Sequence, residues 1–147
     1  MLKNIVTILK LLKRYKLDLL SFNKINRLRW HFPKSYISSR ICLHYEKGQQ
    51  IQIGEHTTIN DFVTITVTND THCNLNNSKL IIGSHTYIGE YNNIRAGGGT
   101  IKIGNYCSIS QHITIIASNH EIAKNKLITE QPWSIKNSSF GVQKSIN

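Results

Sequence analysis

Isoleucine recurs along the middle of this chain at a fixed spacing of six residues. Three segments, residues 53–65, 82–94 and 103–115, align without gaps and carry Ile at their first, seventh and thirteenth positions. Each segment opens with Ile-Gly and has an apolar residue two positions earlier. Neither the 3.6-residue period of a helix nor the two-residue alternation of a strand produces this spacing. A six-residue repeat predicts a parallel β-helix.

The repeat also predicts which side chains point inward. Each hexad supplies one short strand and one turn, so three hexads close one triangular coil of about eighteen residues. The repeated Ile should stack on the Ile of the next coil, and the Gly after it should occupy a corner with little room for a side chain. The residue four positions after each Ile should be small or apolar, a rule that Cys107 fits and Asn92 breaks. We therefore expect Cys107 in the core.

Extra residues between the repeats gather at one place in the pattern. Successive segments begin 29 and 21 residues apart, and the surplus lies around residues 69–79 and 97–100. The third segment leaves the pattern at Ala117 and stays outside it to about Ser139. These three excursions should leave the coils at the same corner, one above another. Long loops gathered on one edge of a rigid scaffold predict a binding site.

At these residues the sequence resembles the hexapeptide-repeat acyltransferases, and most closely the sugar O-acetyltransferases of surface-polysaccharide pathways. The resemblance covers roughly residues 37–135 and is strongest from Asn93 to His120. It implies an all-β solenoid, wound as a left-handed parallel β-helix, with a catalytic-type loop at about 117–139. It also implies transfer of an acetyl group from acetyl-coenzyme A to a sugar hydroxyl, in polysaccharide or lipopolysaccharide modification, by a homotrimer. The sequence does not identify the residues that bind coenzyme A.

The same resemblance assigns roles to residues of the long loop. His120 would be the general base that accepts the proton of the acceptor hydroxyl, a task that suits an imidazole with its unperturbed pKa of about 6.5. Asn119 would position the substrate or bind the thioester oxygen. Glu121 would orient the imidazole or is an exposed loop acid, and Trp133 would bind or orient the substrate.

Other histidines and cysteines favour simpler interpretations. Equivalent outward positions of successive repeats hold two sets of rings, which predict exposed side-chain ladders: His56, His85 and Tyr106, and Phe62, Tyr91 and His112. The paired histidines, five residues apart, of zinc enzymes with this fold are absent, so we expect no metal. The three cysteines form no CxxC motif or even set, which indicates a reducing compartment.

The position of the last residue raises a second functional possibility. The family resumes its hexads after the catalytic loop, whereas this sequence reaches Asn147 without another Ile-Gly hexad. The sequence therefore favours a truncated product, with a short form that borrows surface from its neighbours and an abbreviated scaffold as alternatives. The second functional class is accordingly a truncated, non-catalytic β-helix that binds sugar or only oligomerises.

Charge divides the chain into two parts, which we take as a helical segment (1–36) and a β-helix domain (37–147). Residues 1–40 hold ten Lys and Arg against the single acid Asp18, and residues 41–147 hold eight against seven acids. The pattern of apolar and basic residues over residues 1–29 predicts one or two amphipathic helices that end before Pro33. Residues 1–30 would contact an anionic membrane surface, cap the open end of the β-helix, or both. Nucleic acid is not an expected partner, because no binding motif accompanies the charge. We expect a cytoplasmic protein, with peripheral attachment to the inner face of the membrane as the variant.

Overall fold

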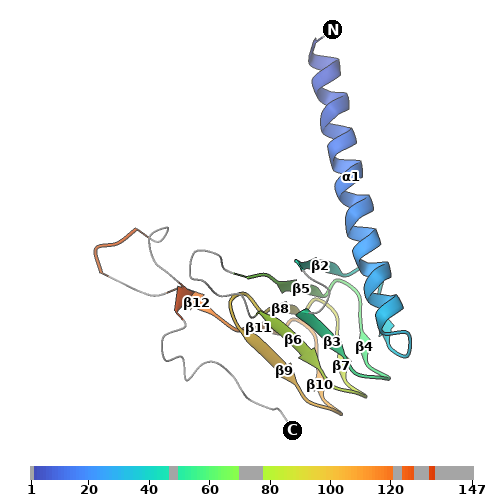
Figure 1. Ribbon diagram of the computed structural model, residues 1–147, viewed down its shortest axis with the longest axis vertical. Helices are drawn as coiled ribbons and strands as arrows, with labels where there is room; N and C mark the ends of the chain where they lie inside the picture. Colours follow the sequence, from blue (N-terminus) through green and yellow to red (C-terminus); the bar gives the residue numbers. More distant parts are fainter. Residues whose placement is uncertain (1, 47–49, 70–77, 121–123, 128–132, 135–147) are drawn as a thin grey trace.

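A long helix precedes a stack of short parallel strands in the computed structural model (Figure 1). The structure describes residues 2–46, 50–69, 78–120, 124–127 and 133–134, with the backbone alone at residues 2–4, 17, 18, 21, 119, 120, 133 and 134. Helix α1 (Leu2–His31) is one continuous element of 30 residues. Within the described residues, no helical segment combines the length and the apolar character needed to cross a membrane.

Eleven of the described strands form three parallel sheets. The first sheet contains β1 (Tyr36–Ile37), β4 (Thr58–Ile59), β7 (Tyr87–Ile88) and β10 (Ser108–Ile109). The second sheet contains β2 (Cys42–Tyr45), β5 (Thr64–Val67), β8 (Asn93–Arg95) and β11 (Thr114–Ile116). The third sheet contains β3 (Ile51–Ile53), β6 (Lys79–Ile82) and β9 (Thr100–Ile103).

The chain visits the three sheets in cyclic order, so each passage through them makes one coil. Every strand pairs in parallel with its counterpart in the neighbouring coil, as Ile59 does with Ile88 and Ile88 with Ile109. Three coils are complete among the described residues, and β10 and β11 belong to a fourth. The prediction of parallel strands stacked with the hexad period is confirmed, in an arrangement compatible with a parallel β-helix. We call β1 to β11 the solenoid.

The repeated isoleucines fill the interior of the solenoid. Alternation along the strands is strict, and in β5 the inward Ile65 and Val67 are fully buried between half-buried threonines. Ile59, Ile88 and Ile94 are likewise completely buried. Burying a side chain of this size stabilises a fold by about 1.5–3 kcal/mol, so the stacked tiers are a major source of stability.

Tight corners explain the glycines that follow the inward isoleucines. A Cβ on Gly83 would lie 2.4 Å from Asn105 Oδ1 and 2.5 Å from the carbonyl carbon of Gly104, and Gly54 meets Ser84 in the same way. Backbone of the next coil therefore occupies the place of a side chain, as predicted. The residues that turn two of the three corners adopt positive φ without being glycine: His56, Phe62, His85, Tyr91, Tyr106 and His112, with φ between 55° and 60°.

Polar side chains inside the corner between the third and first sheets bond the backbone of the next coil. Thr57 Oγ1 donates to the carbonyl of Gly83 at 2.6 Å, and Thr86 Oγ1 donates to that of Gly104 at 2.8 Å. Cys107 occupies the equivalent place in the last coil and is buried, which confirms its expected core position. These bonds satisfy carbonyls that the corners take out of the strand ladders.

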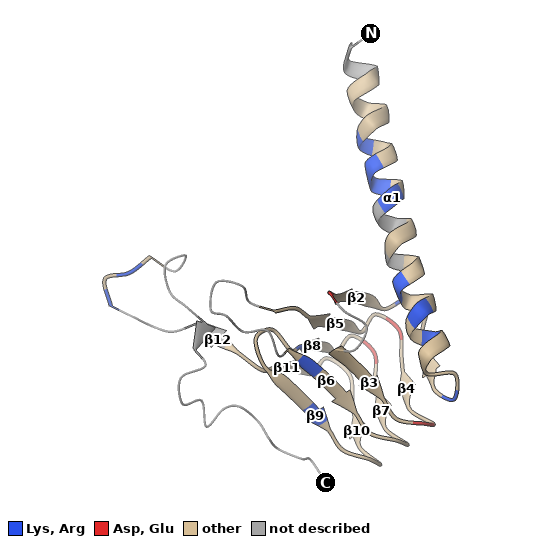
Figure 2. Ribbon diagram, viewed as in Figure 1, with Lys and Arg blue, Asp and Glu red and all other residues tan. Residues whose placement is uncertain are grey.

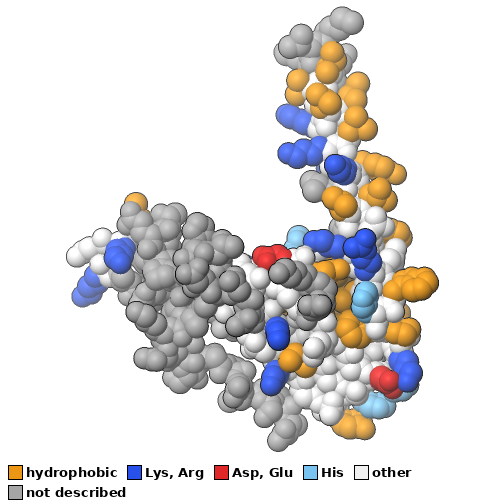
Figure 3. All heavy atoms as spheres, viewed as in Figure 1, with side chains coloured by type: hydrophobic (Ala, Val, Ile, Leu, Met, Phe, Trp, Pro, Cys, Tyr) orange, Lys and Arg blue, Asp and Glu red, His pale blue; other side chains and the backbone are white. Residues whose placement is uncertain are grey.

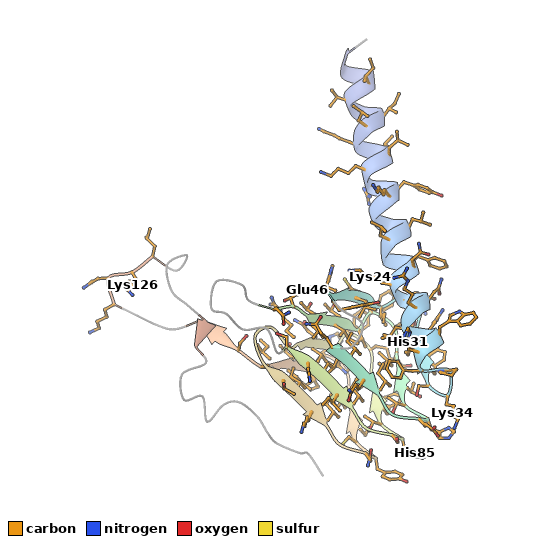
Figure 4. All side chains as sticks on the ribbon, in the orientation of Figure 1. Lys24, His31, Lys34, Glu46, His85 and Lys126 are labelled. Carbon is orange, nitrogen blue, oxygen red and sulfur yellow. The ribbon has the colours of Figure 1, made fainter. Side chains whose placement is uncertain are left out.

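Only the end of α1 packs on the solenoid. Ile25 and Leu28 are buried in the core cluster, and Arg29 Nε donates to the Ile37 carbonyl at 2.7 Å. Lys24 Nζ donates to the Tyr45 carbonyl at 3.0 Å (Figure 4). The rest of the helix points away from the sheets (Figure 1), and its described side chains from residue 5 to residue 16 are all exposed. The capping interpretation therefore holds for the last two turns and not for the helix as a whole.

Candidate functional site at the loop corner

The chain leaves the solenoid repeatedly at the corner between the second and third sheets, which we call the loop corner. Its described parts are residues 46 and 50, 68–69 and 78, 96–99, and 117–118. Backbone hydrogen bonds stack these segments: Ala96 N donates to the Thr66 carbonyl at 2.8 Å, and Ala117 N donates to the Arg95 carbonyl at 3.0 Å. The prediction that the excursions share one corner is confirmed for these residues.

A side-chain network closes the base of the corner in the first three coils. Asn69 donates from its backbone N and from Nδ2 to the two carboxylate oxygens of Glu46, at 3.1 and 3.0 Å. Its Oδ1 accepts from Gln50 Nε2 and from Ser78 N, each at 3.3 Å. Ser78 Oγ donates to the Thr68 carbonyl at 2.7 Å and accepts from Gly98 N at 2.8 Å. The roots of the loops are therefore held in place even though the loops differ in length.

Small residues let the third and fourth coils approach closely at this corner. A Cβ on Gly99 would lie 3.1 Å from the Cβ of Ala117. Gly98 has a φ of 69°, a left-handed conformation that glycine adopts without a steric cost. Ala96 is fully buried beside them. This packing positions the segment that leads directly to His120.

Beyond the corner, the chain forms a short antiparallel ribbon that joins three of the predicted site residues. Strands β12 (Asn119–His120) and β13 (Trp133–Ser134) pair so that Asn119 lies opposite Ser134 and His120 opposite Trp133. Thirteen positions separate the paired His120 and Trp133 in the sequence. Glu121, the fourth predicted residue, lies outside the described residues.

The corner contains polar atoms that the sequence analysis missed. Ser118, directly before the ribbon, is buried, and its Oγ has no hydrogen-bond partner among the described residues. Away from the loop corner, at the start of β8, Asn93 Oδ1 likewise has no hydrogen-bond partner among the described residues. The six-residue repeat predicts only that Asn93 points outward, and it ends before Ser118. It therefore could not predict an unpaired buried atom at either residue.

A thiol–imidazole contact on the second sheet was also missed. Cys42 Sγ lies 3.2 Å from His44 Nε2, and both side chains are exposed on β2. The sequence could have predicted this contact. Side chains alternate between the two faces of a strand, so Cys42 and His44 share the outer face when Leu43 points inward. The pair is on a flat strand and not at the loop corner.

The remaining histidines of the solenoid lie at the two other corners, in the predicted ladders. The rings of His56, His85 and Tyr106 stack with centroids 4.9 Å apart, and those of Phe62, Tyr91 and His112 stack with centroids 5.0 Å apart. Figure 4 shows His85 at the edge of the solenoid, near Lys34. Among the residues that the structure describes, no group of three His, Cys, Asp or Glu side chains could hold a metal ion.

Comparison of the chain with family models, with curated proteins and with solved structures gave no match.

Proposed function

We propose that this protein is a hexapeptide-repeat O-acetyltransferase that transfers an acetyl group from acetyl-coenzyme A to a hydroxyl of a sugar or glycan, with His120 as the general base. The observation that carries the proposal is the ribbon that pairs His120 with Trp133 just outside the loop corner. The acceptor would be part of a polysaccharide or lipopolysaccharide, and the working form would be a left-handed β-helix assembled as a homotrimer.

In the proposed reaction, His120 accepts the proton of the acceptor hydroxyl while the oxygen attacks the thioester carbonyl carbon. The carbon–sulfur bond then breaks, and the proton passes from the imidazolium to the departing thiolate of coenzyme A. Positioned proton transfer of this kind accelerates a reaction about 10²–10⁴-fold. Asn119 and Trp133 would hold the acceptor, and Asn119 or a backbone N–H would stabilise the oxyanion.

Two features of the described structure support this assignment. The solenoid supplies a rigid base, since the hydrogen bonds of Asn69 and Ser78 fix the loop roots. The ribbon then places the strand of His120 beside one that carries an aromatic residue, and aromatic rings commonly bind the apolar faces of ligands. His56, His85 and His112, by contrast, belong to exposed stacks at other corners.

The direct test is thiol release from acetyl-coenzyme A by the purified full chain in the presence of a panel of sugars. We expect acceptor-dependent release, and we expect His120→Ala to lower kcat at least about 100-fold because it removes the base. Trp133→Ala should raise the KM for the acceptor more than it lowers kcat. His112→Ala is the matched control, since it removes an exposed histidine from the last coil, and it should leave the rate unchanged.

An equal rate for His120→Ala and the unaltered chain would refute the role of His120. If the unaltered chain releases no thiol with any acceptor, the non-catalytic scaffold becomes the better proposal for this chain. Binding of the same sugars, measured by calorimetry, would then separate a sugar-binding scaffold from one that only oligomerises.

A further inference from the structure

The projecting part of α1, from residue 5 to residue 22, carries both apolar and cationic side chains, and all of its described side chains are exposed. Most described hydrophobic side chains of this segment are about half exposed or more, including Leu12 at 60% and Tyr15 at 69%. Spacings of three and four residues align six of them along one side of the helix: Ile5, Ile8, Leu12, Tyr15, Leu19 and Phe22. Flanking residues such as Leu9 and Leu11 widen the stripe. Stable proteins rarely leave such a surface in water.

The basic residues lie toward the opposite side, which they share with Val6 and Leu20. At 100° per residue, Lys10, Lys13 and Arg14 lie away from the centre of the apolar stripe, and Lys16 lies at its border. Figure 3 shows Lys and Arg side chains on one side of the middle of the helix and hydrophobic side chains along the other. Neither of the two ion pairs among the described residues involves these four cations.

We infer that residues 5–22 of α1 bind an anionic lipid surface, with the helix lying in the plane of the interface. An amphipathic helix with Lys and Arg on its polar face and aliphatic and aromatic residues on the other inserts its apolar face at the headgroup boundary. Lys16, at the border, has a long aliphatic stem that reaches the headgroups while its ammonium stays in water. The inference does not depend on the proposed reaction, because it uses none of the residues of the loop corner.

The charge of the segment favours lipid over a second copy of the chain. The three-and-four spacing also suits a coiled-coil seam. However, a seam between two copies would leave Lys10, Lys13 and Arg14 on the outer faces without counter-charges, because residues 1–40 hold one acid, Asp18, to offset ten Lys and Arg. The stripe is also wider than the two positions per heptad that a seam needs. An anionic bilayer neutralises the cations and covers the full width of the stripe.

The docked end of the helix would make the attachment rigid. Lys24 and Arg29 bond backbone carbonyls of the first coil, and Leu28 is buried beneath them. Figure 2 shows the basic residues of the chain concentrated along α1, with few on the solenoid. Lipid binding by the helix would therefore hold the solenoid at the surface in one orientation.

The test is co-sedimentation of the full chain with vesicles of phosphatidylcholine alone and of phosphatidylcholine with phosphatidylglycerol. We expect binding to the anionic vesicles at low salt that weakens as salt screens the charges. Each Lys or Arg near such a surface strengthens binding about fivefold, so Lys13→Gln with Arg14→Gln should weaken it about 25-fold. Leu12→Ser should weaken it at least about tenfold, because it removes buried apolar surface. Tyr106→Ser is the control, since it removes a side chain that is 78% exposed on the solenoid, and it should bind as the unaltered chain does.

Sedimentation velocity and circular dichroism of each variant, without vesicles, complete the experiment. They show that a variant is folded, and they reveal any oligomer that depends on the helix. The proposal is overturned if the folded chain stays in the supernatant with anionic vesicles at low salt, or if it binds neutral and anionic vesicles equally. It is also overturned if Leu12→Ser dissociates an oligomer without weakening vesicle binding, which would make the stripe an interface between copies.

Discussion

Asn92 lies at an inward position where the repeat predicts a small or apolar residue. It is 1% exposed, and both polar groups of its side chain form hydrogen bonds with the backbone. Its Nδ2 donates to the carbonyls of Gly89 and Ser110 at 3.1 and 2.6 Å, and its Oδ1 accepts from Ile113 N at 2.6 Å. The pattern could not predict this role, because two of the three partners are backbone groups of the next coil, 18 and 21 positions away, which become neighbours only after the coils stack.

Substitution of Asn92 should therefore cost far more than substitution of its neighbour. Asn92→Ala leaves several corner backbone groups without their partner, and each such group costs about 1–3 kcal/mol when buried. We expect a loss of about 2 kcal/mol or more in the free energy of unfolding, measured by urea denaturation. Asn93→Ala is the matched control, since Asn93 Oδ1 has no hydrogen-bond partner among the described residues, and it should change stability much less. Equal losses would contradict the assigned role.

The element that the sequence located best is the hexad strand, and the one it described least well is the helix. The repeated Ile-Gly pairs predict where the strands lie and which residues pair between coils, because inward and outward positions alternate within each strand. The helix ends at His31, close to the predicted end, because Pro33 cannot continue it. The prediction of one or two amphipathic helices over residues 1–29 did not separate the docked turns from the projecting ones. That division depends on contacts of Ile25 and Leu28 with the solenoid, which no helical period contains.

Two leucines of α1 distinguish its two parts. Leu28 is 4% exposed in the core, and Leu12 is 60% exposed on the projecting segment. Leu28→Ala should lower the free energy of unfolding by about 2–5 kcal/mol because it opens a cavity. Leu12→Ala should change it by less than about 0.5 kcal/mol. Chemical denaturation of both variants in the absence of lipid makes the comparison, and a large loss for Leu12→Ala would mean that the projecting segment packs on the solenoid.

The sequence predicted only some of the residues of the candidate site. The excess loop length and the family resemblance pointed to Asn119, His120 and Trp133, and the structure pairs the strands that carry them, with His120 opposite Trp133. The network of Glu46, Asn69 and Ser78 escaped notice because it joins the roots of three loops that are distant in the sequence. The six-residue repeat indicates where the chain leaves the solenoid. It does not indicate the hydrogen bonds that join the roots of the loops, because these are tertiary contacts.

At the scale of the whole molecule, two carboxylates tie the first coil to the second. Ser38 Oγ and Arg40 donate to Asp61 and hold its pKa below the usual value for Asp, with the Ser38 bond as the larger cause. Lys34 Nζ donates to Glu55 at 2.8 Å and lowers the pKa of that carboxyl. These pairs join the two coils on the side away from the loop corner, where they add to the ladder bonds and the stacked side chains.

The lowered pKa values predict the direction in which pH changes stability. In the unfolded chain both carboxyls titrate near their usual values of about 4, and in the folded chain they titrate lower. Their contribution is therefore complete above about pH 4 and is lost as pH falls through the folded pKa values. Urea midpoints should decline with acid below about pH 4, and Asp61→Asn with Glu55→Gln should flatten that decline. An unchanged slope in the double variant would remove these groups as the cause.

At the loop corner, the length of a loop does not affect the register of the strands that it connects. Paired residues of the second sheet are 22, 29 and 21 positions apart in successive coils, as in Leu43, Ile65, Ile94 and Ile115, yet every pair stays aligned. Insertions and deletions at this corner therefore change what the molecule presents to a ligand without altering the pitch of the coil. A chain built in this way can diversify its recognition surface in evolution, or accept grafted segments in the laboratory, while its scaffold remains the same.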